Sequence, residues 1–171
     1  MPGKPGPRKT HAMRLLEAEG VAYRATVYDA SGGFHAADEA AAMLGIDLAS
    51  MYKTLVVLRD PPARRKALLA MLPSIRDLDL KGLAAALGEK RVRMATRREA
   101  EQLTGMQAGG ISVLGLKKPA GFEVLLDEAA RSRRTLHISA GERGIEIELD
   151  VRDLVRLTGA RFMRTAAPPG P

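Results

Sequence analysis

The most chemically suggestive stretch of the sequence is a glycine-rich segment, Gly109 to Lys118, which reads GGISVLGLKK. Its three glycines surround an apolar segment that is too short for a helix, and glycine lets the backbone adopt positive φ and approach a ligand closely. We expect a bend whose backbone N–H groups face outward, with Lys117 and Lys118 adding positive charge beside them. Such a bend suits a carbonyl oxygen or a phosphate. The alternative interpretation is a plain glycine-rich connection between two strands.

Lys53 is the charged residue with the most informative position. It belongs to an expected strand, Met51 to Leu58, in which alternation of side chains places it on the same face as Leu55 and Val57. Because an unpaired buried ammonium group is costly, the head of this side chain must reach a partner or the mouth of a cavity. Lys53 therefore either anchors an anionic or carbonyl-bearing ligand or extends to water from the end of the strand.

A second polar cluster is expected in a hairpin loop, Ser139 to Gly144, which contains a hydroxyl group, two glycines and Arg143. The loop has neither the G-x-G-x-x-G nor the P-loop spacing of nucleotide sites, so a plain hairpin is the default interpretation. In the strand that follows, Glu146 and Glu148 alternate with apolar residues. This alternation favours a solvated strand face for both carboxylates.

Several common catalytic devices are missing from the sequence. There is no cysteine, which excludes disulfides, thiolate metal sites and a cysteine nucleophile. His11, His35 and His137 lie on different expected elements without paired spacing, so we expect no metal site and no cofactor. No G-x-S-x-G elbow occurs, and no histidine stands out as a base for a serine. Any reaction needs another nucleophile.

The elements that must position these residues are a mixture of helices and strands. Helix caps and apolar periodicity predict helices over 10–19, 36–44, 79–87, 96–103 and 150–157. Alternating or continuous apolar runs predict strands over 22–28, 51–58, 66–72, 91–94, 122–126, 136–138, 145–149 and 161–163. Composition alone leaves a helix open for 66–72, and the apolar end of 51–58 predicts a central strand. Without strict βαβ order, the fold class is α+β: a single domain with a mixed, largely antiparallel sheet and flanking helices.

Length and composition predict one folded domain over residues 10–165. The chain has 171 residues, of which 46% are hydrophobic, enough for a single core. Residues 1–9 and 166–171 are rich in proline and glycine, and we expect a disordered basic leader and a disordered tail. No apolar run approaches the roughly 20 residues that span a bilayer and no signal-peptide core is present, so we expect a cytoplasmic protein that does not bind a membrane.

The charge of the chain points to a polyanionic partner. Its formal net charge is +7, and nucleic acid is favoured over membrane because no strongly amphipathic basic helix is evident. With 4% aromatic residues and no tryptophan, base stacking is not expected to be the main mode of binding.

Four motifs, in order and widely spaced, resemble the YbaK family. They are Tyr52-Lys53-Thr54-Leu55, Leu78-Asp79-Leu80-Lys81, Gly109-Gly110-Ile111-Ser112-x-Leu114-Gly115 and Ser139-x-Gly141-x-Arg143-Gly144-x-x-Ile147-Glu148-Leu149. The resemblance runs from Thr10 to Arg164. Members of this family are freestanding Cys-tRNA(Pro) deacylases, similar to the editing domain inside many bacterial prolyl-tRNA synthetases.

The resemblance implies that the protein removes cysteine mischarged onto tRNA(Pro), with Lys53 as the essential lysine in a positioning role. In the family's mechanism the cysteinyl thiol attacks its own ester carbonyl, the tRNA leaves, and a cyclic thiolactone forms and later hydrolyses. This agrees with the missing protein nucleophile, since intramolecular attack gains an effective molarity of up to about 10⁵ to 10⁸ M. The resemblance also implies that the aminoacyl adenosine is bound by Tyr28, Thr54, Gly109, Gly110, Ser112, Ser139, Gly141 and Glu146. It further suggests a ternary complex with prolyl-tRNA synthetase.

Three positions depart from the family pattern. Glu146 stands where the shorter Asp is usual, Ala140 where glycine is usual, and Ala36 where the pocket phenylalanine aligns, with Phe34 two positions early. These changes leave the fold intact and bear on amino-acid selectivity. Two alternatives stay open: a noncatalytic module that binds tRNA or the synthetase, and a deacylase for another mischarged tRNA such as Ala-tRNA(Pro). The glycine bend favours the YbaK branch over the second alternative.

Overall fold

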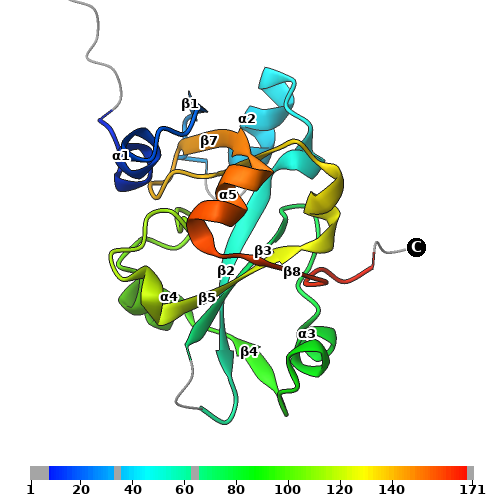
Figure 1. The fold of residues 1–171 in the computed structure, drawn as a ribbon. Coiled ribbons are helices and arrows are strands. Elements are labelled where there is room, and N and C mark those ends of the chain that lie inside the picture. The colour runs from blue at the N-terminus through cyan, green and yellow to red at the C-terminus, as the bar shows by residue number, and fades with distance from the viewer. Residues whose placement is uncertain (1–7, 33–35, 63–65, 169–171) are drawn as a thin grey trace, which may run out of the picture.

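The structure is a computed structural model that describes residues 8–32, 36–62 and 66–168 (Figure 1). Within these residues the α-helices are α1 (His11–Ala18), α2 (Ala36–Leu44), α3 (Leu80–Leu87), α4 (Arg97–Thr104) and α5 (Val151–Thr158). The strands are β1 (Tyr23–Val27), β2 (Tyr52–Arg59), β3 (Ala67–Pro73), β4 (Val92–Met94), β5 (Phe122–Asp127), β6 (Thr135–Ser139), β7 (Ile145–Asp150) and β8 (Arg161–Met163). Three short 3-10 turns are η1 (Leu48–Ser50), η2 (Pro119–Gly121) and η3 (Glu128–Ser132).

The larger of two sheets has five strands in the order β4-β2-β3-β5-β8. β2 runs antiparallel to β3 and β4, whereas β3 with β5 and β5 with β8 form parallel pairs. β2 lies inside this sheet, as its apolar end predicted. The segment whose composition left a helix open is the strand β3, and both of its faces are covered, as in other continuously apolar strands.

The smaller sheet contains three antiparallel strands in the order β1-β7-β6. Along β7, Ile145, Ile147 and Leu149 are buried, and Glu146 and Glu148 project from the opposite face. The predicted α+β class is therefore confirmed, with the strands divided between two sheets.

The main hydrophobic core lies between the two sheets. It joins Ile138 and Ile147 of the smaller sheet to Met71 and Leu126 of the larger one, together with residues of α1 and α5. Since side chains alternate along a strand, the other face of the larger sheet carries a second apolar cluster, which is covered by Leu83 of α3. Figure 1 shows α3 and the smaller sheet at opposite ends of the molecule.

Helix boundaries follow the capping residues that the sequence predicted. The side chains of Thr10, Asp79, Thr96 and Asp150 each accept a hydrogen bond from a backbone N–H in the first turn of the following helix. Thr96 also forms a reciprocal capping box with Glu99. Local sequence therefore determines where α1, α3, α4 and α5 begin.

The ordered chain extends past the predicted start of the C-terminal tail at residue 166. The backbone N–H of Ala166 donates to Asp127 Oδ2 at 2.8 Å, and that of Ala167 donates to the Asp77 carbonyl at 2.8 Å. Residues 1–7 of the predicted leader and 169–171 of the tail lie outside the described residues. None of the helices in the described part of the chain is long and apolar enough to cross a membrane.

Candidate functional site

A cavity of about 380 Å³ lies where the start of β2 meets the glycine bend and one edge of the smaller sheet. Six of the predicted site residues line it: Tyr28, Lys53, Thr54, Gly109, Ser139 and Glu146. The other three, Gly110, Ser112 and Gly141, lie outside its lining. Segments that are far apart in the sequence therefore come together around one space.

Lys53 lies near the start of β2, opposite Leu72 of β3. Its side chain is half-buried and borders the cavity, and Val57 on the same strand face is fully buried. Among the residues that the structure describes, its ammonium group has neither a hydrogen-bond partner nor a carboxylate at ion-pair distance. Of the two alternatives for Lys53, a cation at a cavity and a side chain that extends to water, its place in the cavity lining favours the first.

The predicted bend is present, because residues 105–118 form turns without a helix or a strand. Its amides, however, do not all face outward as predicted. The N–H of Gly110 donates to the Gln107 carbonyl at 2.9 Å, and the N–H of Leu114 donates to Ser112 Oγ at 3.2 Å. The segment therefore satisfies much of its own backbone, and Ser112, which is fully buried, holds the bend together from inside.

Two amides of the bend remain available. Gly109 and Ile111 both border the cavity, and within the described residues their N–H groups have no hydrogen-bond acceptor. Lys117 and Lys118, which were expected to add charge beside these donors, are exposed and do not line the cavity. The positive charge at the cavity comes from Lys53 and from Arg143, which sequence reasoning had noted only as part of the hairpin loop.

Gly110 and Gly141 allow the bend and the hairpin loop to pack closely. A Cβ atom on Gly110 would lie 2.8 Å from the backbone nitrogen of Arg143, which is closer than real Cβ contacts. Gly141 has a φ of +98°, a left-handed conformation that favours glycine. These glycines therefore hold the two loops together, and each loop contributes a neighbouring residue, Gly109 or Arg143, to the cavity lining.

Glu146 is the cavity residue whose environment changes its chemistry most. It lies between Thr26 of β1 and Ser139 of β6, and its burial raises its pKa to about 8. At neutral pH its carboxyl group is therefore mostly protonated and able to donate a hydrogen bond. Burial, followed by the charge of Glu146, also raises the pKa of Tyr28.

The predicted solvated face is wrong for Glu146. Its carboxyl group is buried in a cavity that the start of β2 and Asp38 of α2 also line. The side chain of Glu148 keeps contact with solvent on this face, at 23% exposure, and its carboxylate accepts a hydrogen bond from Thr135 Oγ1 at 2.9 Å and lies 3.7 Å from Arg24 Nε.

Sequence reasoning missed several residues of the cavity. They are Ala30, Asp38, Met51, Tyr52, Leu55, Ser74, Ile111 and Arg143. Antiparallel pairing of β2 with β3 brings Ser74 beside Met51, whose carbonyl accepts the Ser74 N–H at 2.8 Å. The hydroxyl group of Ser74 is buried without a partner among the described residues.

The three departures from the family pattern lie in different places. Glu146 lines the cavity, whereas Ala140 is fully buried in the main core. Ala36 begins α2, and Phe34 lies outside the described residues. Of these positions, Glu146 is the one that the structure places in the cavity lining.

A second hollow, of about 370 Å³, is lined mostly by arginine side chains. This basic groove is lined by Arg131, Arg133, Arg134, Asp150, Val151, Arg152 and Phe162. The guanidinium group of Arg131 stacks 4.2 Å from the ring centre of Phe162. Arg133 donates twice to Asp47 Oδ2, at 3.2 Å each, and Asp47 caps η1, which leads directly into Met51 on the cavity wall. The basic groove and the cavity are thus joined through η1.

Within residues 8–32, 36–62 and 66–168 there is no group of three or more histidine, aspartate or glutamate side chains that could hold a metal ion.

Comparisons with known proteins agree with this geometry. Residues 32–157 match the model of the aminoacyl-tRNA editing domain. The chain is 36% identical over 155 residues to EbsC of Enterococcus faecalis, named as a candidate Cys-tRNA(Pro)/Cys-tRNA(Cys) deacylase, and the match covers 91% of this chain and 92% of EbsC. It is 28% identical over 114 residues to a proline–tRNA ligase of Pediococcus pentosaceus, covering 67% of this chain and 19% of the ligase.

A solved structure shows the same fold. The crystal structure of a candidate trans-editing enzyme for prolyl-tRNA synthetase superimposes with a TM-score of 0.77 and 25% identity, covering 96% of this chain and 100% of the other. The match to the editing-domain model spans most of the folded residues, including β2, the glycine bend and the hairpin loop. The chain therefore belongs to the aminoacyl-tRNA editing domain family.

Proposed function

We propose that this protein is a trans-editing deacylase that removes cysteine from mischarged tRNA(Pro). The observation that carries the proposal is the composition of the cavity, where the unpaired ammonium group of Lys53 shares one space with the available amides of Gly109 and Ile111. An ammonium group and two N–H donors suit an ester carbonyl on which negative charge develops. The family membership and the name of EbsC support the same reaction class.

The cavity also favours a reaction in which the substrate supplies the nucleophile. Its hydroxyl groups belong to Tyr28, Tyr52, Thr54, Ser74 and Ser139, and in the described part of the chain none of them bonds to a histidine or a lysine that could act as a base. In the proposed step the cysteinyl sulfur bonds to its own carbonyl carbon, the bond from that carbon to the ribose oxygen breaks, and the thiol proton ends on the leaving oxygen. Water later opens the thiolactone.

Four cavity residues have direct roles in this scheme. Lys53 orients the ester through its ammonium group, and the N–H groups of Gly109 and Ile111 bind the carbonyl oxygen as it gains charge. The protonated carboxyl group of Glu146 donates a hydrogen bond to the aminoacyl adenosine. Tyr28, directly after β1, and Ser139 of β6 also line the cavity.

The partner in this proposal is the acceptor end of tRNA(Pro), and prolyl-tRNA synthetase delivers the specificity for that tRNA. The basic groove supports the first point, because guanidinium groups bind phosphates with paired N–H donors and the groove adjoins the cavity through η1. The similarity to part of a proline–tRNA ligase and to a candidate trans-editing enzyme supports the second.

The test is deacylation of a panel of mischarged tRNAs, with and without prolyl-tRNA synthetase. Cysteinyl esters should be lost rapidly, whereas seryl and alanyl esters should persist, because a hydroxyl is a poorer nucleophile than a thiol and a methyl group is none. Equal loss of alanyl and cysteinyl esters would contradict the thiol mechanism and favour a deacylase for Ala-tRNA(Pro). Binding of Cys-tRNA(Pro) with an intact ester would favour a noncatalytic module.

The role of Lys53 has a matched test in the same assay. Lys53→Ala should lower the rate about 100-fold, the size of effect seen when one preorganised donor is removed. Lys81→Ala removes the same charge from an exposed position on α3 and should leave the rate unchanged. A folded Lys53→Ala protein with full activity would refute the assignment.

A further inference from the structure

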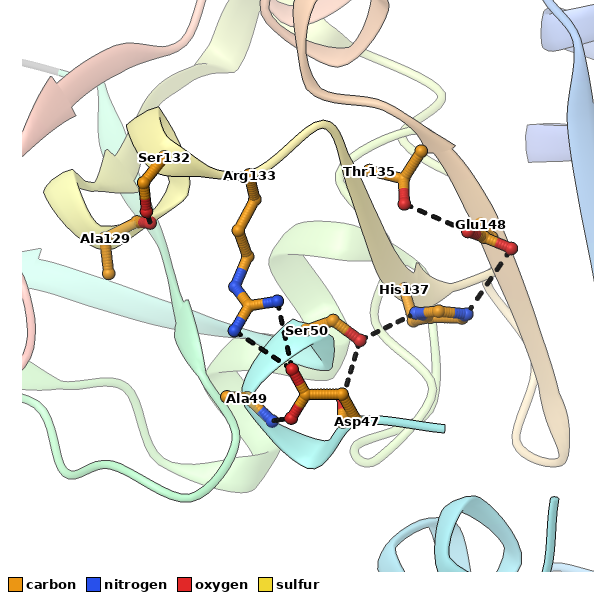
Figure 2. Close-up of polar contacts among 9 residues, drawn as sticks. All are labelled: Asp47, Ala49, Ser50, Ala129, Ser132, Arg133, Thr135, His137 and Glu148. Atoms are coloured by element: carbon orange, nitrogen blue, oxygen red, sulfur yellow. Dashed lines mark hydrogen bonds and ion pairs between the residues drawn. The ribbon is translucent and has the colours of Figure 1, made fainter. Parts of the chain in front are cut away.

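Three residues of the types found in hydrolytic triads meet beside the cavity, at the joint between η1 and the smaller sheet. Figure 2 shows Ser50 directed to one ring nitrogen of His137 and Glu148 directed to the other. Ser50 Oγ lies 3.0 Å from His137 Nδ1, and His137 Nε2 lies 3.6 Å from Glu148 Oε2. Ser50 is buried and does not line the cavity, so the cluster needs an explanation other than nucleophilic attack.

The protons of this cluster can be assigned from its contacts. Ser50 Oγ lies 2.6 Å from the carbonyl oxygen of Asp47, which can only accept, so the single hydroxyl proton of Ser50 points there. The contact with His137 must then be a hydrogen bond from Nδ1–H to Ser50 Oγ. Ser50 is therefore held by the imidazole and is not activated by it.

The other side of the ring faces charged groups of the smaller sheet. Glu148 approaches Nε2, accepts a hydrogen bond from Thr135 and lies near Arg24 of β1, while Asp47 on the η1 side is paired with Arg133. Burial holds the pKa of His137 below its ordinary value, with Glu148 opposing this effect. Nδ1 carries a proton in both the neutral and the charged ring, so the bond to Ser50 persists when Nε2 titrates.

The bond joins the two walls of the cavity. Ser50 precedes Lys53 by three residues, and Met51 between them forms a bridge with His137. On the other wall, His137 lies two residues before Ser139 on the same face of β6, and Ser139 is the partner of Glu146 on β7. A shift at His137 would therefore move the start of β2 relative to Ser139 and Glu146.

We propose that His137 is a positioning residue, which fixes Lys53 relative to the smaller sheet by donating from Nδ1 to Ser50. The consequence for deacylation rests on the proposed function of the cavity. The hydrogen bond itself and its effect on the start of β2 do not depend on that function, so the two can be tested separately.

The kinetic test uses variants that remove or keep the donor. His137→Ala and Ser50→Ala should each lower kcat for Cys-tRNA(Pro) about tenfold while changing KM less than about twofold, because the geometry of the reacting group is affected and RNA binding is not. His137→Asn keeps an N–H donor close to the Nδ1 position and should recover most of the rate. His11→Ala, at an exposed position of α1, is the matched control. Equal losses in His137→Asn and His137→Ala, or a change in KM alone, would overturn the proposal.

Two measurements test the hydrogen bond between His137 and Ser50 without a deacylation assay. Nitrogen-15 spectra of the histidine rings should show the Nδ1–H tautomer for His137, assigned by its loss in His137→Asn. Amide exchange at Ser50 and Met51, whose N–H groups bond to Asp47 and Leu48, should accelerate in His137→Ala and return toward wild type in His137→Asn. An Nε2–H tautomer, or unchanged exchange in His137→Ala, would reject the hydrogen bond. If the wild type binds Cys-tRNA(Pro) without cleaving it, the proposed function fails and these two measurements still decide the positioning role.

Discussion

Single residues give the cavity its chemistry through burial more than through partners. Lys53 carries an ammonium group without an ion-pair partner among the described residues, while burial keeps the carboxyl group of Glu146 protonated at neutral pH. The Lys53 cation and the neutral acid of Glu146 therefore border the same space, together with Arg143 and Asp38. A carboxylate in place of this acid would repel an oxyanion that develops in the same cavity, so the protonation of Glu146 matters for the proposed reaction.

The stability of the protein should depend on pH through Glu146. Burial raises its pKa to about 8 from 4.5, so the folded state holds a proton that the unfolded state releases between these values. The bound proton therefore contributes to the free energy of unfolding. This contribution is fully present below pH 4.5 and is lost as the pH rises through 8. Glu146→Gln has no such loss, and its stability relative to wild type should rise by about 2 kcal/mol from pH 5 to pH 9, a value reduced from the full shift because the cavity side meets solvent.

Urea unfolding at pH 5, 7 and 9 measures this difference. Glu142→Gln, at an exposed position of the hairpin loop, is the matched control and should follow the wild type at each pH. A constant difference between Glu146→Gln and wild type across this range would show that the carboxyl group titrates normally.

At the scale of elements, local sequence predicted most of the fold. Capping residues located α1, α3, α4 and α5, and apolar patterns located the eight strands, because both signals depend on neighbours in the chain. Alternation along β2 predicted the face of Lys53, whereas its role in a site was implied by the resemblance to the YbaK family. The division into two sheets, the parallel pairs of β5 and the cover over Glu146 depend on contacts between distant segments, which no local pattern specifies.

The packing of the glycine bend on the hairpin loop should tolerate no side chain at Gly110. A Cβ atom there would lie 2.8 Å from the backbone nitrogen of Arg143, so one of the two loops must move. Gly110→Ala should therefore lower the free energy of unfolding by about 1 to 3 kcal/mol, as overpacking does, and should also slow deacylation, because Gly109 and Arg143 line the cavity.

The matched control is Gly121→Ala, where an added Cβ atom would meet nothing within 4 Å. Chemical denaturation and the deacylation assay should both give wild-type values for this variant. Wild-type stability in Gly110→Ala would mean that the two loops are not in close contact in solution.

At the scale of the whole molecule, part of the positive charge of the chain gathers in the basic groove, which adjoins the cavity through η1. Arg134 makes no direct ion pair among the described residues, although Asp150 is close enough to interact with its charge, and the side chain of Arg152 is 89% exposed beside Asp150. Paired arginines still keep free donors, because a guanidinium group has five N–H bonds. An acceptor stem whose 3′ end enters the cavity would place its phosphates near these side chains.

The double variant Arg134→Ala with Arg152→Ala should therefore weaken binding of Cys-tRNA(Pro). The slope of log K against the logarithm of the salt concentration should become less steep by about 1 to 2, one unit for each lost phosphate contact. Lys81→Ala with Lys90→Ala removes the same charge from exposed positions near α3, at the far end of the larger sheet, and should keep the wild-type slope. Cysteinyl adenosine, which has no stem, should be cleaved equally by both double variants and the wild type, because it reaches only the cavity. A double variant of the groove that loses activity on cysteinyl adenosine as well would place Arg134 and Arg152 in the support of the cavity and not in RNA binding.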